Sequence, residues 1–174
     1  MLSVNTAHSG QINSLCFLHD GLHLLSFGTD NNLRLWDATT GRNTLVNYGK
    51  ITNRCRKAVK VAVSRGTTPT VAFVPSDGDV VACDVFGGSI FDTLRGHYNQ
   101  VNCCIINPDI HEMYSGSNDR NILAWTPDVD VVRAYEEEVR GGMMRGQAGR
   151  IAAATNFTSR VGGGLADSWS SGED

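Results

Sequence analysis

The sequence predicts an all-β fold of about three four-stranded antiparallel units, the last one incomplete, followed by a disordered tail. Two observations predict it. The 174-residue chain matches itself at an offset of 89 residues, and residues 8–36 and 97–125 share eight identities without a gap. In addition, short apolar and β-branched runs separated by Gly, Pro, Asp and Asn fill the chain up to about residue 126.

The identities at this offset include Trp and His, two of the rarer residue types, so chance does not explain them. They pair His8 with His97, Gln11 with Gln100, Asn13 with Asn102, Asp20 with Asp109, Ser26 with Ser115, Asp30 with Asp119, Asn32 with Asn121 and Trp36 with Trp125. An offset of 89 is two periods of about 40–45 residues, the length of one propeller blade. We therefore predict a partial β-propeller over residues 6–127, with blades at 6–49, 50–95 and 96–127.

Each blade is expected to contain short strands joined by turns. In the first blade the turns Asp20-Gly21 and Gly41 separate strands at 12–18, 22–27, 33–36 and 43–48. The middle blade is degenerate, because it lacks the repeated His, Ser and Trp. Its strands are expected at 58–63, 70–74, 79–85 and 89–94.

The third blade is predicted to lack its fourth strand. Strands are expected at 101–107, 112–116 and 121–125, and the chain then runs into Pro127. Residues 128–174 form a Gly- and Ser-rich, acidic tail with one short helical pattern at 131–140. This composition cannot bury enough apolar area to offset chain entropy, so we expect the tail to be disordered.

The recurring Ser, His and Asp have two interpretations. A hydrolase would need an exposed nucleophile and an oxyanion hole, and no G-x-S-x-G turn is present. The structural interpretation is stronger, because each set comes with a Trp whose buried indole N–H needs an acceptor. We therefore expect two structural tetrads and no catalytic residue: His8, Ser26, Asp30 and Trp36, and His97, Ser115, Asp119 and Trp125.

Composition narrows the class of protein further. The net charge of −3 argues against a protein whose main task is to bind nucleic acid, and no apolar run is long enough to span a membrane. The five cysteines are scattered singly, without the spacing of a zinc site. We expect them to be reduced core residues, and we expect no metal or cofactor.

With Gly96-His97, Trp36-Asp37 and the spacing of the tetrads, the chain resembles the WD40 repeat family, over about 120 of its residues. Within that family it resembles the C-terminal blades of the Cockayne syndrome WD-repeat proteins. The segments that carry this second resemblance are 6–8, 20–25, 33–36, 43–50, 96–98, 114–117, 121–125 and the end of the chain at 166–171.

This resemblance implies a protein-binding scaffold and not an enzyme. It implies the substrate receptor of a cullin–RING ubiquitin ligase used in transcription-coupled nucleotide excision repair, which is a nuclear process. The implied partners are the damaged-DNA-binding protein adaptor of the ligase and repair factors associated with RNA polymerase II. The alternative is a generic WD-repeat interaction scaffold, for example in signalling or RNA processing, with no link to ubiquitin ligases.

Two departures limit what the resemblance implies. The chain holds about three blades, whereas a closed ring of seven needs roughly 300 residues, and the adaptor-binding helices of the family are absent. Receptors of this class also often carry Trp-Asp-x-Arg after a blade's third strand, but here Trp36-Asp37 is followed by Ala38-Thr39 and Trp125 by Thr126-Pro127. We therefore expect this chain alone not to bind the adaptor.

Partners of such a scaffold are expected to contact loops on one rim, because the strands are occupied by packing between blades. In WD families the exposed positions lie at the start of the first strand and in the turn before the blade's Asp. The matching residues here are Gln11, Asn13 and Thr29 in one blade and Gln100, Asn102 and Asn118 in the other. Arg34, on a third strand, is expected to be a surface cation.

Overall fold

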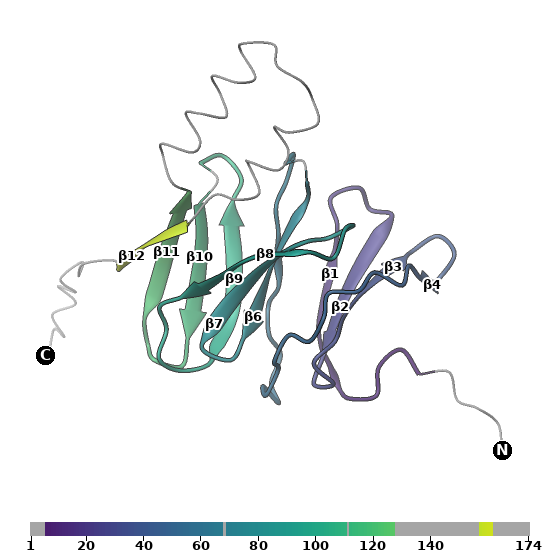
Figure 1. Ribbon diagram of the computed structural model, residues 1–174, viewed down its shortest axis with the longest axis horizontal. Coiled ribbons are helices and arrows are strands. Elements are labelled where there is room, and N and C mark those ends of the chain that lie inside the picture. The colour runs from purple at the N-terminus through teal and green to yellow at the C-terminus, as the bar shows by residue number, and fades with distance from the viewer. Residues whose placement is uncertain (1–5, 68, 111, 128–156, 162–174) are drawn as a thin grey trace, which may run out of the picture.

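The computed structural model describes residues 6–67, 69–110, 112–127 and 157–161, and every regular element among them is a strand. The strands form three antiparallel sheets of four strands each (Figure 1). The all-β prediction and its three blades are confirmed. Among the described residues no helix is long and apolar enough to cross a membrane.

The first blade follows the predicted order and ends earlier than predicted. Its strands are β1 (Ile12–Phe17), β2 (His23–Gly28), β3 (Leu33–Asp37) and β4 (Arg42–Asn43). The prediction that the last strand reaches residue 48 is wrong, because Leu45 adopts a positive φ of 63° that interrupts the extended backbone. Tyr48 instead enters the core and donates a hydrogen bond to the carbonyl of Val85.

The middle blade contains β5 (Ala62–Val63), β6 (Val71–Ser76), β7 (Asp79–Asp84) and β8 (Ile90–Arg95). Strand β5 is shorter than predicted because the residues before it bond to the neighbouring blades. The Val59 N–H donates to the Asn13 carbonyl, and the Lys60 N–H donates to the Asn102 carbonyl, each at 2.9 Å. This segment therefore links the inner strands of all three blades.

The third blade is complete, which corrects the prediction that it lacks a fourth strand. It contains β9 (Val101–Asn107), β10 (Glu112–Ser117), β11 (Ile122–Pro127) and β12 (Phe157–Val161), and β12 pairs antiparallel with β11. The predicted disorder of the tail is therefore wrong for 157–161. These residues include Phe, Thr and Val, which favour strands, and the pairing satisfies backbone groups along the edge of β11. The helical pattern at 131–140 and the rest of the tail lie outside the described residues.

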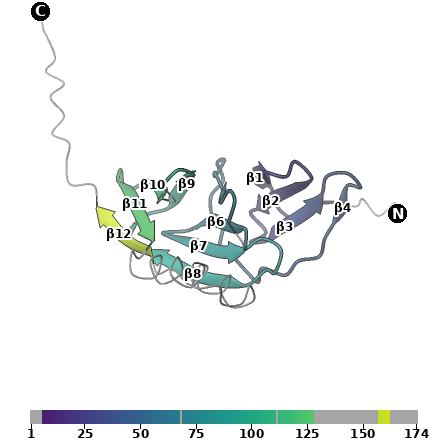
Figure 2. The same cartoon turned by 90° about the horizontal axis from the view of Figure 1, so that it is seen from above.

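The three sheets follow one another along an open arc, with β4, β8 and β12 on its outer side (Figure 2). Two apolar cores fill the spaces between them. One joins the first and middle blades and includes Leu25, Phe27 and Val74. The other joins the middle and third blades and includes Phe73, Met113 and Trp125. The burial of apolar side chains between successive sheets therefore holds the arc together.

The two ends of the arc present sheet faces that no other described segment covers. Leu15 on the outer face of the first blade is 64% exposed, whereas Cys104, its repeat equivalent in the third blade, is fully buried against the middle blade. At the other end, Ile105 is 54% exposed and Cys103 is exposed. The prediction that all cysteines are core residues is therefore wrong for Cys103, although all five are free thiols.

Candidate functional site

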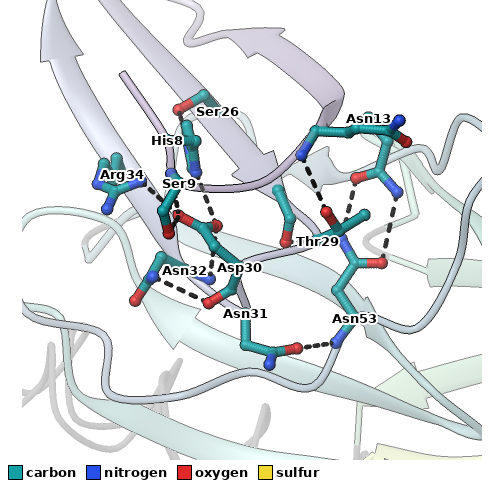
Figure 3. Close-up of polar contacts among 12 residues, drawn as sticks. His8, Ser9, Asn13, Ser26, Thr29, Asp30, Asn31, Asn32, Arg34 and Asn53 are labelled. Carbon is teal, nitrogen blue, oxygen red and sulfur yellow. Dashed lines mark hydrogen bonds and ion pairs between the residues drawn. The ribbon is translucent and has the colours of Figure 1, made fainter. Parts of the chain in front are cut away.

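The first tetrad is assembled from four separate places in the first blade. The Ser26 hydroxyl lies 2.7 Å from His8 Nε2 and accepts a hydrogen bond from the Trp36 indole N–H at 2.8 Å. The other ring nitrogen of His8, Nδ1, lies 2.8 Å from the Asp30 carboxylate (Figure 3). The loop before β1 is thereby joined to β2, β3 and the turn between them.

The second tetrad repeats this geometry in the third blade. Ser115 Oγ lies 2.8 Å from His97 Nε2 and 2.8 Å from Trp125 Nε1, and His97 Nδ1 lies 2.8 Å from Asp119. Burial is what differs between the two copies. Trp125 is only 2% exposed, because the middle blade covers it, whereas Trp36 is half-buried on the uncovered end of the arc.

The hydrogen bonds in each tetrad run in one direction. The indole N–H donates to the Ser oxygen, so the Ser hydroxyl donates to His Nε2, and the protonated His Nδ1 donates to the carboxylate. A neutral imidazole with its proton on Nδ1 satisfies every group in this chain of bonds. The set therefore serves to pair buried polar groups with one another.

The carboxylates at the ends of these chains are held ionised. Burial raises the pKa of Asp30, but hydrogen bonds from His8, Arg34 and Asn32 outweigh that effect and hold the pKa well below its ordinary value. Arg34 Nη1 donates to Asp30 at 3.0 Å, so this half-buried cation also belongs to the site. Burial and hydrogen bonds from Asn121 and His97 act on Asp119, with a net lowering of its pKa.

Neither serine is placed as a nucleophile. Ser26 and Ser115 are 2% and 1% exposed, so a substrate cannot reach either hydroxyl. Both hydroxyls are also occupied by an indole donor and an imidazole acceptor. Among the described residues, no group of three or more His, Cys, Asp and Glu side chains could hold a metal ion.

Two glycines make room for the tetrads. A Cβ at Gly28 would lie 2.7 Å from His8 Nδ1 and 2.8 Å from the Asp30 carboxylate. A Cβ at Gly96 would lie 2.8 Å from Leu123 Cδ1 and 3.1 Å from the Trp125 ring. The Gly96-His97 pair is therefore explained by close packing of the indole against the backbone before the His.

A second polar network fixes the long connection between the first and middle blades. Asn53 Nδ2 donates to Asn13 Oδ1 at 2.9 Å and to the Gly28 carbonyl at 3.0 Å, and the Asn53 N–H donates to Asn31 Oδ1 at 2.7 Å (Figure 3). Asn13 Nδ2 donates in turn to the carbonyls of Cys55 and Lys57 at 2.8 and 3.1 Å. Asn31 has a φ of 62°, and Asn tolerates this left-handed conformation better than most residues.

The predicted partner-facing residues all lie on the rim that contains the starts of β1 and β9. The Thr29 N–H bonds to the Gln11 carbonyl, and the Asn118 N–H bonds to the Gln100 carbonyl, so each turn lies beside its strand start. Gln11 and Asn118 are exposed, and Thr29, Gln100 and Asn102 are half-buried. Asn102 donates to Asn118 at 2.7 Å. The Asn13 amide is used within the molecule, so it is not free to face a partner.

Sequence reasoning missed two parts of this rim. Asn53 was not recognised because its contacts lie more than twenty residues away in the sequence. The exposed cations of the same connection, Arg54, Arg56 and Lys57, were also not recognised. A local signal for them exists, because no Asp or Glu occurs between Asp37 and Asp77 whereas seven Lys and Arg do.

Comparisons with known proteins agree with this geometry. The family model "WD domain, G-beta repeat" matches residues 1–37 and 88–126, the segments that contain the two tetrads. The chain is 40% identical over 122 residues to WD repeat-containing protein ATCSA-1 of Arabidopsis thaliana, covering 70% of this chain and 27% of that protein. It is 27% identical over 132 residues to pre-mRNA-processing factor 17 of Homo sapiens, covering 75% of this chain and 22% of that protein.

The fold also matches a solved structure, described as "Structure of U3-55K", with a TM-score of 0.57 and 21% identity. That match covers 70% of this chain and 37% of the other, and it supports the fold alone. The chain spans about a quarter of the length of the two curated relatives. From its matched segments, its two tetrads and its three blades, the chain is a member of the WD40 repeat family.

Proposed function

We propose that this chain is part of a substrate-receptor subunit of a cullin–RING ubiquitin ligase that acts in transcription-coupled nucleotide excision repair in the nucleus. The observation that carries the proposal is the 40% identity over 122 residues with ATCSA-1. The resemblance of segments 6–8, 43–50 and 96–98 to Cockayne syndrome WD-repeat proteins points in the same direction. Because only 27% of ATCSA-1 is covered, the whole-protein role is an extension from these blades.

The geometry supports a binding role. The strands are occupied by pairing within blades and packing between them. The serine hydroxyls of the two tetrads, which a hydrolase would need to expose, are buried. The rim loops are what remains for partners, and they present amides, an exposed tyrosine and cations. A receptor needs such a rim and needs no chemistry of its own, because ubiquitin transfer is carried out by other subunits of the ligase.

Co-purification tests the proposal. A longer version of the protein, with further blades, should co-purify with the damaged-DNA-binding protein adaptor. The 174-residue chain alone should not, since Thr39 stands where related receptors carry the Arg of Trp-Asp-x-Arg. Loss of the longer protein should delay recovery of RNA synthesis after ultraviolet irradiation. The ligase role would be refuted if the longer version does not co-purify with the adaptor and its loss does not delay this recovery.

One observation favours a second candidate, a WD-repeat scaffold in RNA processing with no ligase link. The chain is 27% identical over 132 residues to a human protein whose name places it in pre-mRNA processing. The same co-purification separates the two candidates. Recovery of RNA-processing proteins without the adaptor would select the second, whereas recovery of the adaptor would select the first.

A further inference from the structure

We propose that the connection between the first and middle blades is a docking surface for an acidic protein segment. The surface is defined here as the basic rim and consists of Lys50, Arg54, Arg56, Lys57 and Lys60; the exposed Tyr98 lies in the loop before β9, which is bonded to the turn that contains Asp77. This inference rests on the proposed scaffold function and names the chemistry of the partner. It depends on the charge, rigidity and setting of these side chains.

The charge of the basic rim is concentrated and almost unpaired. Residues 38–76 contain seven Lys and Arg and no Asp or Glu, in a chain whose net charge is −3. All five cations of the rim are exposed. Of these five cations, all of which lie in the described part of the chain, only Arg54 has an ion pair, 3.5 Å from Asp77, and its side chain is 77% exposed. Such an exposed pair is weak and readily exchanged for a partner's carboxylate.

The backbone that carries these cations is held in place. Asn13 binds the carbonyls of Cys55 and Lys57, and Asn53 anchors the same connection to Gly28 and Asn31 (Figure 3). At its end, Lys60 is bonded to the neighbouring inner strand, with its N–H at 2.9 Å from the Asn102 carbonyl and its carbonyl at 2.9 Å from the Cys104 N–H. A fixed backbone reduces the ordering that binding requires.

The setting favours a protein segment over a phosphate backbone. Tyr98 is 80% exposed, and its hydroxyl accepts a hydrogen bond from Asn121 at 2.9 Å. Asp77 connects Arg54 to the loop that contains Tyr98. Its carboxylate lies 3.5 Å from Arg54, and its carbonyl accepts a hydrogen bond from the N–H of Val101, three residues after Tyr98. Tyr and Arg are enriched in protein interfaces, and nearby amides can bond to an extended peptide backbone. A nucleic acid would instead need a longer basic track.

The opposite rim has a different character. The turns there carry exposed or half-buried acids at Asp20, Asp37, Asp84 and Asp109. Those turns also carry Arg42 and Arg65, whereas the connection that forms the basic rim contains cations and no Asp or Glu, so charge favours the basic rim for an acidic partner. This asymmetry orients the partner and is expected to increase the rate at which it associates.

The test uses the whole 174-residue chain and a fluorescent Glu/Asp-rich peptide, with binding followed by anisotropy at increasing salt. The double variant Arg56→Glu/Lys57→Glu keeps the Lys57 carbonyl bond, and we expect it to weaken binding by about tenfold or more. Arg42→Glu/Arg65→Glu changes the net charge equally at positions outside the basic rim, and it should weaken binding by less than about threefold. Tyr98→Ala should weaken binding without changing its salt dependence.

Three outcomes would overturn the inference: no binding of the peptide, equal weakening by both double variants, or tighter binding of a single-stranded oligonucleotide that the Arg56 and Lys57 changes abolish. Circular dichroism and thermal melting of each variant verify that the blades are folded. Adaptor co-purification is measured separately, so a failure of the basic rim and a failure of the proposed ligase role remain distinguishable.

Discussion

Ser115→Ala isolates the second tetrad, because one hydroxyl joins its indole and its imidazole. In the structure, Trp125 Nε1 and His97 Nε2 each lie 2.8 Å from Ser115 Oγ, and Ser115 is 1% exposed. Removing the oxygen leaves both groups buried without this partner. Each orphaned group costs about 1–3 kcal/mol, so the free energy of unfolding should fall by about 2–6 kcal/mol.

Ser26→Ala serves as the matched comparison in the first blade. The bonds are the same, but Trp36 is half-buried, so water can partly hydrate the polar groups that lose the serine hydroxyl. We expect a loss of about 1–3 kcal/mol, smaller than the loss at Ser115. The difference between the two losses measures how much burial under the middle blade increases the contribution of the tetrad to the free energy of unfolding.

Urea unfolding followed by tryptophan fluorescence measures both losses. The midpoint should shift to lower urea with an unchanged slope, which would show that stability changed and the extent of unfolding did not. Ser89→Ala, on an exposed turn, is the control and should stay within about 0.5 kcal/mol of the natural chain. If Ser115→Ala falls within that same range, the tetrad is not a stabilising network and the reasoning is refuted.

Three further predictions follow from burial and charge. Met113→Ala should cost about 2–5 kcal/mol, because Met113 is 1% exposed between blades, whereas Leu15→Ala should cost less than about 1 kcal/mol at 64% exposure; equal costs in urea unfolding would show that the end face is covered. Because the folded pKa of Asp30 is lowered, its contribution is present above the unfolded value of about 3.9 and is lost as pH falls through the folded value, so Asp30→Asn should flatten the acid limb of a stability–pH curve. Asn53→Ala should lower stability by about 1–3 kcal/mol and speed hydrogen exchange at Ile51 and Val59; unchanged exchange would contradict the anchoring role of Asn53.

The repeat was readable in the sequence because local patterns determine it. Alternating apolar residues and turn residues predicted most strands of the three blades. The offset of 89 residues identified the eight tetrad residues without any contact information. The spacing pointed to them because a buried indole requires an acceptor, and a Ser, a His and an Asp that can form a chain of hydrogen bonds recur with it at fixed distances.

Tertiary structure decided which copies of the repeat are covered and which edges are paired. The same tetrad is buried in the third blade and partly open in the first, because only the third has a preceding blade packed on that face. Strand β12 comes from a segment whose composition favoured disorder, and it was specified by the open edge of β11. The Asn13–Asn53 network and the fixed basic rim join positions 40 residues apart, and such contacts depend on packing that no local pattern encodes.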